Sequence, residues 1–313
     1  MVGRIFVLGS FVVACSVTVS RFPVAGESLR ADMLTVEPGG KGFNLAVGAA
    51  RLGASVDGLM AIGDDLLSSF AAPALSKAGL PLTMLKRLPG ATGGGVAFTD
   101  ATGENCLAVH PGANFLLSAQ DVAAAADRIE QAQLVLAQFE IDDAPIAEAF
   151  RLARQAGVRT LLNPSPYRSI KPEILANTSI LVVNAGEALA LAETLSPASR
   201  TGSGAITEDE LAQAIQQGGP DTLIVTRGPQ GAVAFQRDEP PLVQAAFAIE
   251  ARDSIGAGDA FAAGLSASLV TGLPLSEALR RAAACGALVA SRIGVFEALP
   301  TAAELQDFLA AHA

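Results

Sequence analysis

The stretch Asp253-Ser-Ile-Gly-Ala-Gly-Asp259-Ala-Phe261 decides how the rest of the chain is interpreted. It follows a strand-like run, residues 243–250, and leads into an almost uncharged helical run, residues 260–270. Gly256 and Gly258 let the backbone turn tightly where a helix begins. The free N–H groups and the dipole at a helix start favour an anion. The stretch therefore predicts a strand, a turn and a helix, with an anion site at the turn.

Asp259 lies beside this expected anion site, where its charge would repel the anion. The conflict is resolved if Asp259 takes a proton from a nucleophile while the N–H groups of the turn stabilise charge on a transferred phosphoryl group. The alternative is an aspartate that only caps a buried helix. The segment alone leaves both interpretations open.

Composition excludes several classes of partner. The chain has 313 residues, half of them apolar, so it can form one large domain or a domain plus a small one. The 31 acidic and 21 basic residues give a net charge of −10, and no run of lysines or arginines occurs. This balance argues against nucleic acid and against an anionic membrane surface as partners.

The cysteines and histidines also limit the chemistry. Cys15, Cys106 and Cys285 are far apart and without CxxC spacing, so they predict neither a disulfide framework nor a zinc site. A reducing, cytoplasmic location fits this pattern. His110 and His312 lie in an expected turn and in the C-terminal tail, so a carboxylate is the better candidate for a catalytic base.

The N-terminal segment allows two interpretations. Arg4 followed by an apolar run that ends at Val12-Val-Ala-Cys15 is typical of a lipoprotein signal. The run is short and is broken by Gly9-Ser10, and it fits a buried first strand, which we prefer. No uninterrupted apolar run reaches the length of a membrane-spanning helix.

Strand-like and helical runs alternate along most of the chain. Strands are expected at residues 5–13, 56–62, 134–139, 160–162, 180–183, 223–226 and 232–235. Helices are expected at residues 44–52, 66–78, 119–131, 145–156, 187–195, 207–217, 260–270, 275–291 and 302–311. This alternation predicts an α/β fold with a doubly wound, mostly parallel sheet and helices on both faces.

Two sections, residues 13–38 and 93–109, have the alternation of half-exposed strands and lie outside this pattern. Because both leave strands of the early sheet, we expect them to pair into one small β lid. The core would then comprise residues 1–12, 39–92 and 110–313.

Polar clusters follow several of the expected strands, at the edge where open α/β sheets bind ligands. Asn184 and Glu187 could hold a hydrated Mg²⁺, which prefers oxygen ligands, or could form a helix N-cap with its third residue. Thr226-Arg-Gly-Pro-Gln-Gly231 suits phosphate contacts or an ordinary hairpin loop. Gln138 and Glu140, and Asn163-Pro-Ser-Pro166, follow two further strands. Neither a P-loop nor the GxGxxG of a Rossmann dehydrogenase follows a strand.

At this point the chain resembles the ribokinase-like (PfkB) carbohydrate kinases over nearly its full length. Gly39-Gly-Lys-Gly-Phe-Asn44 is similar to the first family signature, and residues 253–261 are similar to the second, with Ser254 where threonine is usual. Asn184-Ala-Gly-Glu187 resembles the NxxE motif, and residues 226–231 resemble the ATP-phosphate loop. Gly112-Ala-Asn114 and Asn163-Pro-Ser-Pro166 match further landmarks.

The resemblance implies transfer of the γ-phosphoryl group of ATP to a hydroxyl of a sugar or sugar-like molecule, with ATP, Mg²⁺ and in many members K⁺. Asp259 would be the base, and the N–H groups of residues 255–258 would form the anion hole. A homodimer through the lid is also implied. The residues with an implied catalytic role beside Asp259 are Gly256, Ala257 and Gly258, and those implied to bind the substrate are Gly40, Lys41, Asn44, Glu140 and Asp259. Those implied to bind ATP are Asn184, Thr226, Gly228, Gly231 and Gly258. Mg²⁺ is implied at Asn184 and Glu187, and K⁺ near Asp253, Ile255, Val289, Arg292 and Gly294.

One departure concerns the acceptor. Family members usually carry an aspartate, often after an asparagine, at the end of the first strand, where this chain has Val12 and Ala14. Since charge-assisted hydrogen bonds are lost there, we expect an acceptor with fewer hydroxyls or one held by other groups. The alternative function is a sugar- or nucleotide-binding protein of the same fold with impaired catalysis.

Overall fold

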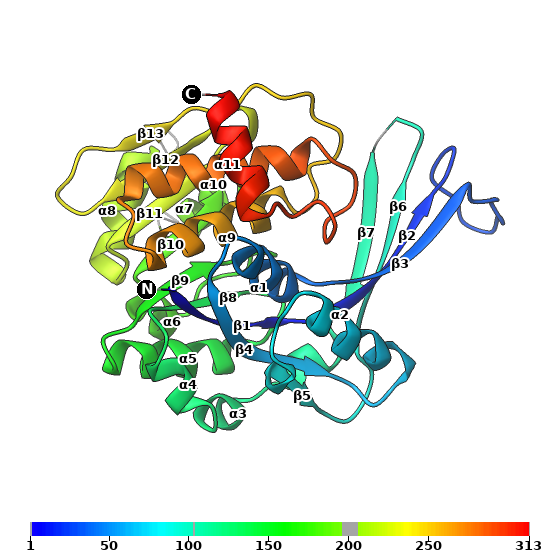
Figure 1. The fold of residues 1–313 in the computed structure, drawn as a ribbon, viewed down its shortest axis with the longest axis horizontal. Helices are drawn as coiled ribbons and strands as arrows, with labels where there is room; N and C mark the ends of the chain where they lie inside the picture. The colour runs from blue at the N-terminus through cyan, green and yellow to red at the C-terminus, as the bar shows by residue number, and fades with distance from the viewer. Residues whose placement is uncertain (1, 103, 196–205, 313) are drawn as a thin grey trace.

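The computed structural model describes residues 2–102, 104–195 and 206–312. Its centre is a nine-stranded sheet (Figure 1). The strands are β1 (Arg4–Ser10), β4 (Ser55–Ile62), β5 (Leu85–Arg87), β8 (Leu134–Gln138), β9 (Arg159–Asn163), β10 (Ile180–Asn184), β11 (Thr222–Thr226), β12 (Ala232–Gln236) and β13 (Leu242–Gln244). Their order is β13-β12-β11-β10-β9-β8-β1-β4-β5, and every pair is parallel except β11–β12 and β12–β13. The predicted doubly wound, mostly parallel sheet is confirmed.

Helices cover both faces of this sheet. One face carries α1 (Lys41–Arg51), α2 (Ala71–Lys77), α9 (Ala257–Val270), α10 (Leu275–Ala290) and α11 (Ala302–Ala311). The other carries α3 (Ala119–Ala123), α4 (Ala126–Glu130), α5 (Asp143–Gln155), α6 (Pro172–Ala176), α7 (Ala185–Leu195) and α8 (Glu208–Gly218). Short 3₁₀ helices are η1 (Leu66–Phe70), η2 (Leu82–Met84), η3 (Gly112–Leu116) and η5 (Gly228–Gln230).

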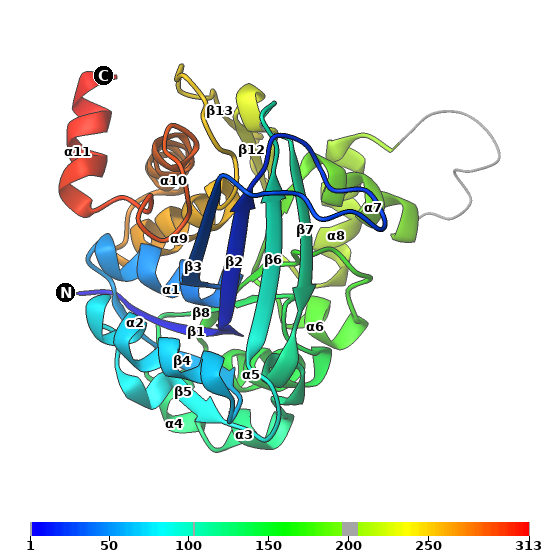
Figure 2. The ribbon, with the colours of Figure 1, turned by 90° about the vertical axis from the view of Figure 1, so that its right-hand side faces the viewer.

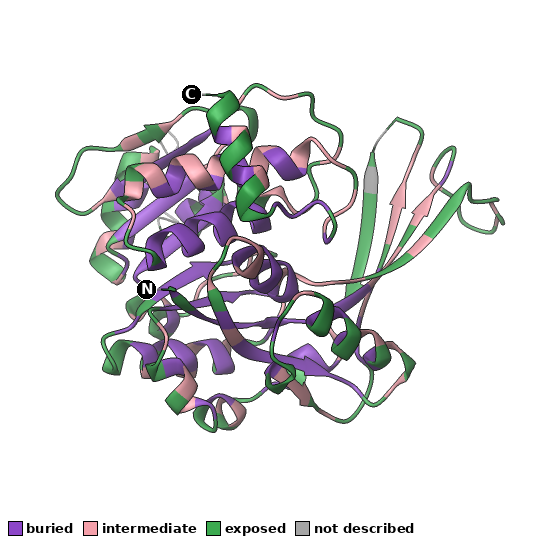
Figure 3. Ribbon diagram, viewed as in Figure 1, coloured by how far each residue is buried: buried purple, intermediate pink, exposed green. Residues whose placement is uncertain are grey.

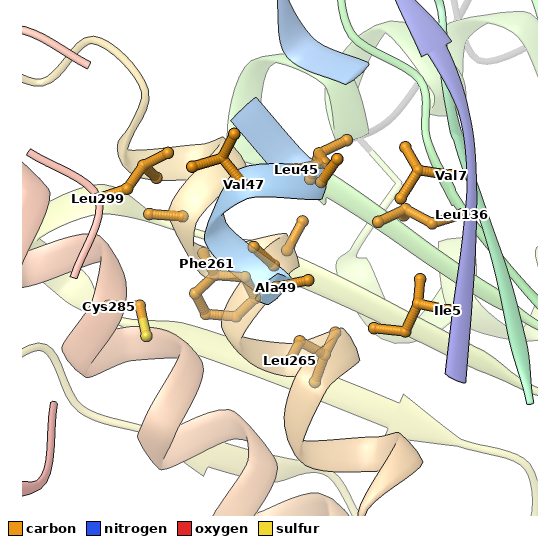
Figure 4. Close-up of a cluster of buried hydrophobic side chains, with 14 of the residues drawn as sticks. Ile5, Val7, Leu45, Val47, Ala49, Leu136, Phe261, Leu265, Cys285 and Leu299 are labelled. Carbon is orange, nitrogen blue, oxygen red and sulfur yellow. The ribbon is translucent and has the colours of Figure 1, made fainter. Parts of the chain in front are cut away.

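Successive residues of the central strands belong to two separate hydrophobic cores, because their side chains point to opposite faces of the sheet. Ile5 and Val7 pack beneath α1 and α9, whereas Phe6 and Leu8 join the cluster on the other side. Figure 4 shows the cluster that contains Ile5 and Val7, in which Phe261 of α9 lies between α10 and the side chains of the sheet. Apart from the short edge strands β5 and β13, the strands of the large sheet are mostly buried (Figure 3).

Four further strands make a second sheet, which we call the small sheet: β2 (Val12–Thr18), β3 (Met33–Gly39), β6 (Gly93–Thr99) and β7 (Asn105–His110). Their order is β3-β2-β6-β7 (Figure 2). β2 pairs in parallel with β6, so the two predicted insertions do pair with each other.

One amide side chain joins two of the four connections between the small sheet and the core. Only Phe11 separates β1 from β2, and Asn114 accepts a hydrogen bond from Phe11 N at 3.0 Å. The same side chain donates to Phe11 O and to Pro111 O, each at 2.8 Å. Asn114 is fully buried. It therefore ties the start of β2 to the chain that leaves β7.

Several predicted boundaries were wrong. The first strand does not run through residue 13, because Phe11 separates β1 from β2. Residues 245–250 form no strand: Phe247 turns away to pack edge-on against Phe308 of α11, with ring centroids 5.2 Å apart. The helix expected at 66–78 is η1 followed by α2, since Pro73 is tolerated only in the first turn of a new helix. The helix expected at 119–131 is divided into α3 and α4. None of the helices described is long and apolar enough to cross a bilayer.

Candidate active site

Asp259 lies in the first turn of α9 and is 4% exposed. The helix begins after Gly256, whose φ of 79° is in the left-handed region, and a Cβ there would lie 2.5 Å from Val295 Cγ1. Glycine is therefore required at this turn. A Cβ at Gly258 would meet nothing within 4 Å, so open space adjoins the helix start.

Two of the four N–H groups expected to form the anion hole already have acceptors. Ile255 N donates to Asp253 Oδ1 at 2.9 Å, and Ala257 N donates to Ser254 O at 3.2 Å. The first N–H groups of an α-helix have no acceptor within the helix. Gly256 and Gly258 are thus better placed than Ile255 and Ala257 to bind an anion.

Two side chains of α1 contact the carboxylate of Asp259. Asn44 Nδ2 donates to Asp259 Oδ2 at 2.9 Å, and Lys41 Nζ lies 3.6 Å from Oδ1. The nearby Asp259 carboxylate raises the pKa of Lys41; burial opposes this, while Glu140 and Glu187 add to it. Of the buried side-chain atoms described, Asn44 Oδ1 and Arg281 Nε have no hydrogen-bond partner. Asn44 therefore presents an unused acceptor beside the candidate base.

Glu140 follows β8 and lies beside the end of β1, at the point where the order of the strands in the sheet reverses. Its Oε2 accepts from Ser10 Oγ at 2.6 Å and from Lys41 N at 2.9 Å. Gln138 Nε2 and Gly42 N donate to the same Ser10 hydroxyl, at 2.9 and 3.2 Å. A Cβ at Gly42 would lie 2.2 Å from Ser10 N, so only glycine permits this approach of α1 to β1.

The loop that carries Glu140 is held by Arg168. Its guanidinium donates to Phe139 O at 2.5 Å, to Ile141 O at 2.7 Å, and to Asp143 Oδ1 at 2.7 and 2.9 Å. The group also lies 4.0 Å from the centre of the Phe139 ring. Glu140 is therefore flanked on both sides by carbonyls bonded to one cation.

Asn184 and Glu187 form the reciprocal arrangement that the sequence offered as the alternative. Asn184 N donates to Glu187 Oε2 at 2.9 Å, and Glu187 N donates to Asn184 Oδ1 at 2.8 Å. The pair therefore caps α7. Glu187 Oε1 takes no part in this cap and is the oxygen that could face an ion.

The loop after β11 lies next to this cap. Thr226 is paired with Asn184 in the sheet register, which brings the two strand ends side by side. Arg227 N donates to Gly231 O at 2.7 Å and closes a tight turn around η5. A Cβ at Gly228 would meet nothing within 4 Å, so the backbone here is open to a ligand. By contrast, Asn163 Nδ2 donates to Val182 O at 3.0 Å and stabilises the sheet.

Asp253, Ile255 and Gly294 are also brought together. Asp253 Oδ2 accepts from Gly294 N at 3.4 Å, in addition to its bond with Ile255 N. The Arg292 guanidinium instead binds Ala298 O and Glu304 at the start of α11, and Val289 O accepts from Arg292 N. Arg292 could thus contact an ion only through its backbone.

Sequence analysis missed Ser10 and Arg168. A polar residue at the end of a buried strand was the available signal for Ser10. Arg168 had none, because it lies in a loop and its partners are 25 to 29 residues earlier.

Residues 3–302 match the model of the pfkB family carbohydrate kinases. The chain is a pfkB family carbohydrate kinase. It is 30% identical to the deoxyribokinase of Salmonella typhimurium over 311 residues, 97% of this chain and 98% of that protein. It is also 30% identical to the ribokinase of Bacillus subtilis over 306 residues, 98% and 99% of the two chains. The Arabidopsis thaliana ribokinase structure, complexed with ribose and ATP, matches this pfkB kinase with a TM-score of 0.86 and 26% identity over 99% of both chains.

This kinship settles the class of enzyme. The pfkB kinase is a sugar kinase, a phosphotransferase with an alcohol group as acceptor. The ribokinase-like fold expected from the two signatures is confirmed by the same structural match.

Proposed function

We propose that this kinase transfers the γ-phosphoryl group of ATP to a hydroxyl of a sugar, with Asp259 as the base. The supporting observation is the position of Asp259, buried at the start of α9 between Asn44 and Lys41, with open space at Gly258. ATP as donor and a pentose as acceptor agree with the ribose and ATP of the Arabidopsis structure and with the names of the relatives.

In the proposed reaction, Asp259 accepts the proton of the acceptor hydroxyl as that oxygen bonds to the γ-phosphorus and the bond to ADP breaks. The N–H groups of Gly256 and Gly258 stabilise the charge that develops on the phosphoryl oxygens. Lys41 keeps its charge because its pKa is raised, and it balances the carboxylate before transfer. Asn44 Oδ1 and Glu140 orient the sugar hydroxyls.

The nucleotide is proposed to lie along the ends of β10 and β11, contacting Asn184, Thr226, Gly228 and Gly231. The donor set fits Mg²⁺ only in part: Glu187 Oε1 offers one oxygen, and the described residues hold no cluster of three metal-binding His, Cys, Asp or Glu side chains. The ion would therefore keep several waters and take ligands from the phosphates. When bound, it neutralises charge on the transferred group.

K⁺ is proposed to bind beside the anion hole, near Asp253, Ile255 and Gly294, with backbone oxygens of Val289 and Arg292 as further candidates. The half-buried Asp253 supplies the only side-chain charge of this set that is not already paired with a second side chain, since Arg292 binds Glu304. A cation there would offset the negative charge that Asp253 brings close to the start of α9.

The small sheet is proposed to act as a lid and as a dimer surface. Its residues Leu34, Val36 and Val96 expose 62, 44 and 42% of their surface and, by the sheet register, share one face. Contiguous exposed apolar residues mark interaction surfaces. A cytoplasmic location is proposed from the three free thiols.

The test is ADP release from Mg-ATP with a panel of pentoses, hexoses and nucleosides, using Asp259→Asn and, as control, Asp307→Asn on the exposed surface of α11. Loss of a general base lowers kcat by about 10²–10⁴-fold. We expect Asp259→Asn to show this loss and Asp307→Asn to match the wild type. Sugar-dependent thermal stabilisation without ADP from the wild type would contradict the proposal and favour a binding protein.

A further inference from the structure

The small sheet has two faces, and its register assigns each side chain to one of them. Successive residues of a strand point to opposite faces, and directly paired residues share a face. Val12 and Ala14 of β2 therefore lie on the same face as their partners on the other strands. We call this the inner face, made of Val12, Ala14, Glu37, Gly93, Gly95 and Val109.

The base of the opposite face, near Val13 and Gly94, rests on the core beside η1. Val13 is 3% exposed and belongs to the buried cluster that includes Phe43. A Cβ at Gly94 would lie 3.6 Å from Leu67 Cδ1 of η1. The inner face therefore points away from η1. Its base begins two residues after Ser10, and a Cβ at Gly40 would lie 3.0 Å from Val12 N. We infer that the inner face forms one wall of the acceptor site.

The chemistry of this wall differs from that of the rest of the site. Asn44 Oδ1, Lys41 and Glu140 offer hydrogen bonds on one side. On β2, β6 and β7 the base of the inner face offers only aliphatic side chains and glycines. The first hydroxyl on this face of β2 is Ser16, four residues and roughly 13 Å beyond Val12.

Glu37 is the one charged residue near the base of the inner face. It is exposed and lies on the edge strand β3, across from Ala14. Glu37 and Pro38 also border a cavity of about 360 Å³ together with Phe70 and Phe296. The Glu37 carboxylate is the charged group near this base that could bind an acceptor hydroxyl, and a Glu37→Gln variant tests that possibility.

We propose that the acceptor is a deoxy sugar whose carbon without a hydroxyl faces Val12 and Ala14. This proposal specifies the substrate of the proposed kinase function and rests on it. A hydroxyl turned toward this wall would leave water without gaining a partner, whereas a C–H group would bury apolar surface. An apolar pocket discriminates against one added hydroxyl by at most about 100-fold. The wall thus favours the deoxy form of the acceptor by about 10- to 100-fold.

The first measurement compares sugars that differ by one hydroxyl: D-ribose with its 2-deoxy and 3-deoxy forms, and D-glucose with its 2-deoxy form. Both kcat/KM and the dissociation constant are measured. We expect at least one deoxy sugar to have a kcat/KM about 10-fold or more above that of its parent and a dissociation constant lower by a similar factor. The proposal is overturned if every parent sugar has a kcat/KM and an affinity equal to or greater than those of its deoxy forms, or if no deoxy sugar binds. Absence of ADP with all sugars would reject the kinase mechanism, while the dissociation constants would still decide the nature of the wall.

The second measurement adds a hydrogen-bonding group to the wall. Ala14→Ser and Ala14→Asp should lower the ratio of kcat/KM for deoxy over parent sugar by about 10-fold, with the KM for ATP unchanged as a sign of intact folding. Cys15→Ser, on the opposite face of the same strand, is the matched control and should leave the ratio unchanged. Glu37→Gln should also leave it unchanged; loss of affinity for the parent sugar in this variant would show that Glu37 holds a hydroxyl and would overturn the proposal.

Discussion

Asp253 uses both carboxylate oxygens to connect two segments of the candidate cation site. Oδ1 accepts from Ile255 N, two residues along the chain, and Oδ2 accepts from Gly294 N, 41 residues away. The two bonds fix the turn that precedes Gly256, where the anion hole is proposed. The Asp253 carboxylate thus connects the proposed K⁺ site to the turn that holds the proposed anion hole.

Asp253→Asn should therefore remove any dependence of activity on potassium. The measured quantity is the ratio of kcat in potassium chloride to kcat in choline chloride at equal ionic strength. We expect a ratio of several-fold in the wild type, because a bound cation offsets the Asp253 charge next to the anion hole, and a ratio near one in the variant. Equal ratios in both proteins would contradict a K⁺ site at Asp253, with Asp307→Asn again serving as the surface control.

At the scale of elements, the loop between β8 and α5 positions Glu140 through Arg168. The guanidinium binds the carbonyls on both sides of Glu140 and the carboxylate of Asp143 in the first turn of α5. Hydrogen bonds from a charged group are worth about 1.5–3 kcal/mol each, so the loop conformation depends on this one side chain. Its hydrogen bonds go to Phe139, Ile141 and Asp143, and not to Asp259 or the proposed nucleotide loops.

Arg168→Met should raise the KM for the sugar by about 10-fold and leave the KM for ATP unchanged, because only the Glu140 side of the site loses its support. Arg151→Met is the control, since Arg151 binds Glu148 and Gln155 on the surface of α5. Steady-state kinetics with each substrate varied in turn make the distinction. An equal rise in both KM values would show that Arg168 serves general stability only.

Sequence analysis located most elements and the motifs at the strand ends, because these depend on local periodicity and on glycine. It correctly expected segments 13–38 and 93–109 to pair, although β1 ends at Ser10 and not at the predicted residue 13. The short elements β5 and α6 were missed, since three to five residues carry little periodicity. Local signals also could not decide between a cap and an ion site at Asn184 and Glu187, because the same residue types serve both.

At the scale of the molecule, the small sheet is more exposed than the core (Figure 3). Its outer apolar residues Leu34, Val36 and Val96 lie on the face opposite to Val12 and Ala14. If two copies cover this face, the inner wall of each remains available for its own acceptor. The proposed dimer and the proposed sugar site therefore use opposite surfaces of the same four strands.

Leu34→Glu combined with Val96→Glu should give a monomer, because both place a negative charge within this apolar face and the like charges of two copies repel. Multi-angle light scattering over a range of concentrations measures the mass. Leu189→Glu, at a residue 59% exposed on α7, is the control and should leave the mass unchanged. A wild-type protein that remains monomeric at every concentration would contradict the dimer.

The single amide of Asn114, which ties Phe11 to Pro111, has a consequence for how such enzymes diversify. Because Asn114 joins two of the four connections at one buried point, the small sheet is held to the core there by a single side chain. Exchanging residues 12–39 and 93–110 between kinases that share this hydrogen-bonded link would transfer the proposed sugar-facing wall while leaving Asp259 and the proposed nucleotide loops unchanged. The preference for an acceptor and the chemistry of phosphoryl transfer could in this way change independently within one chain.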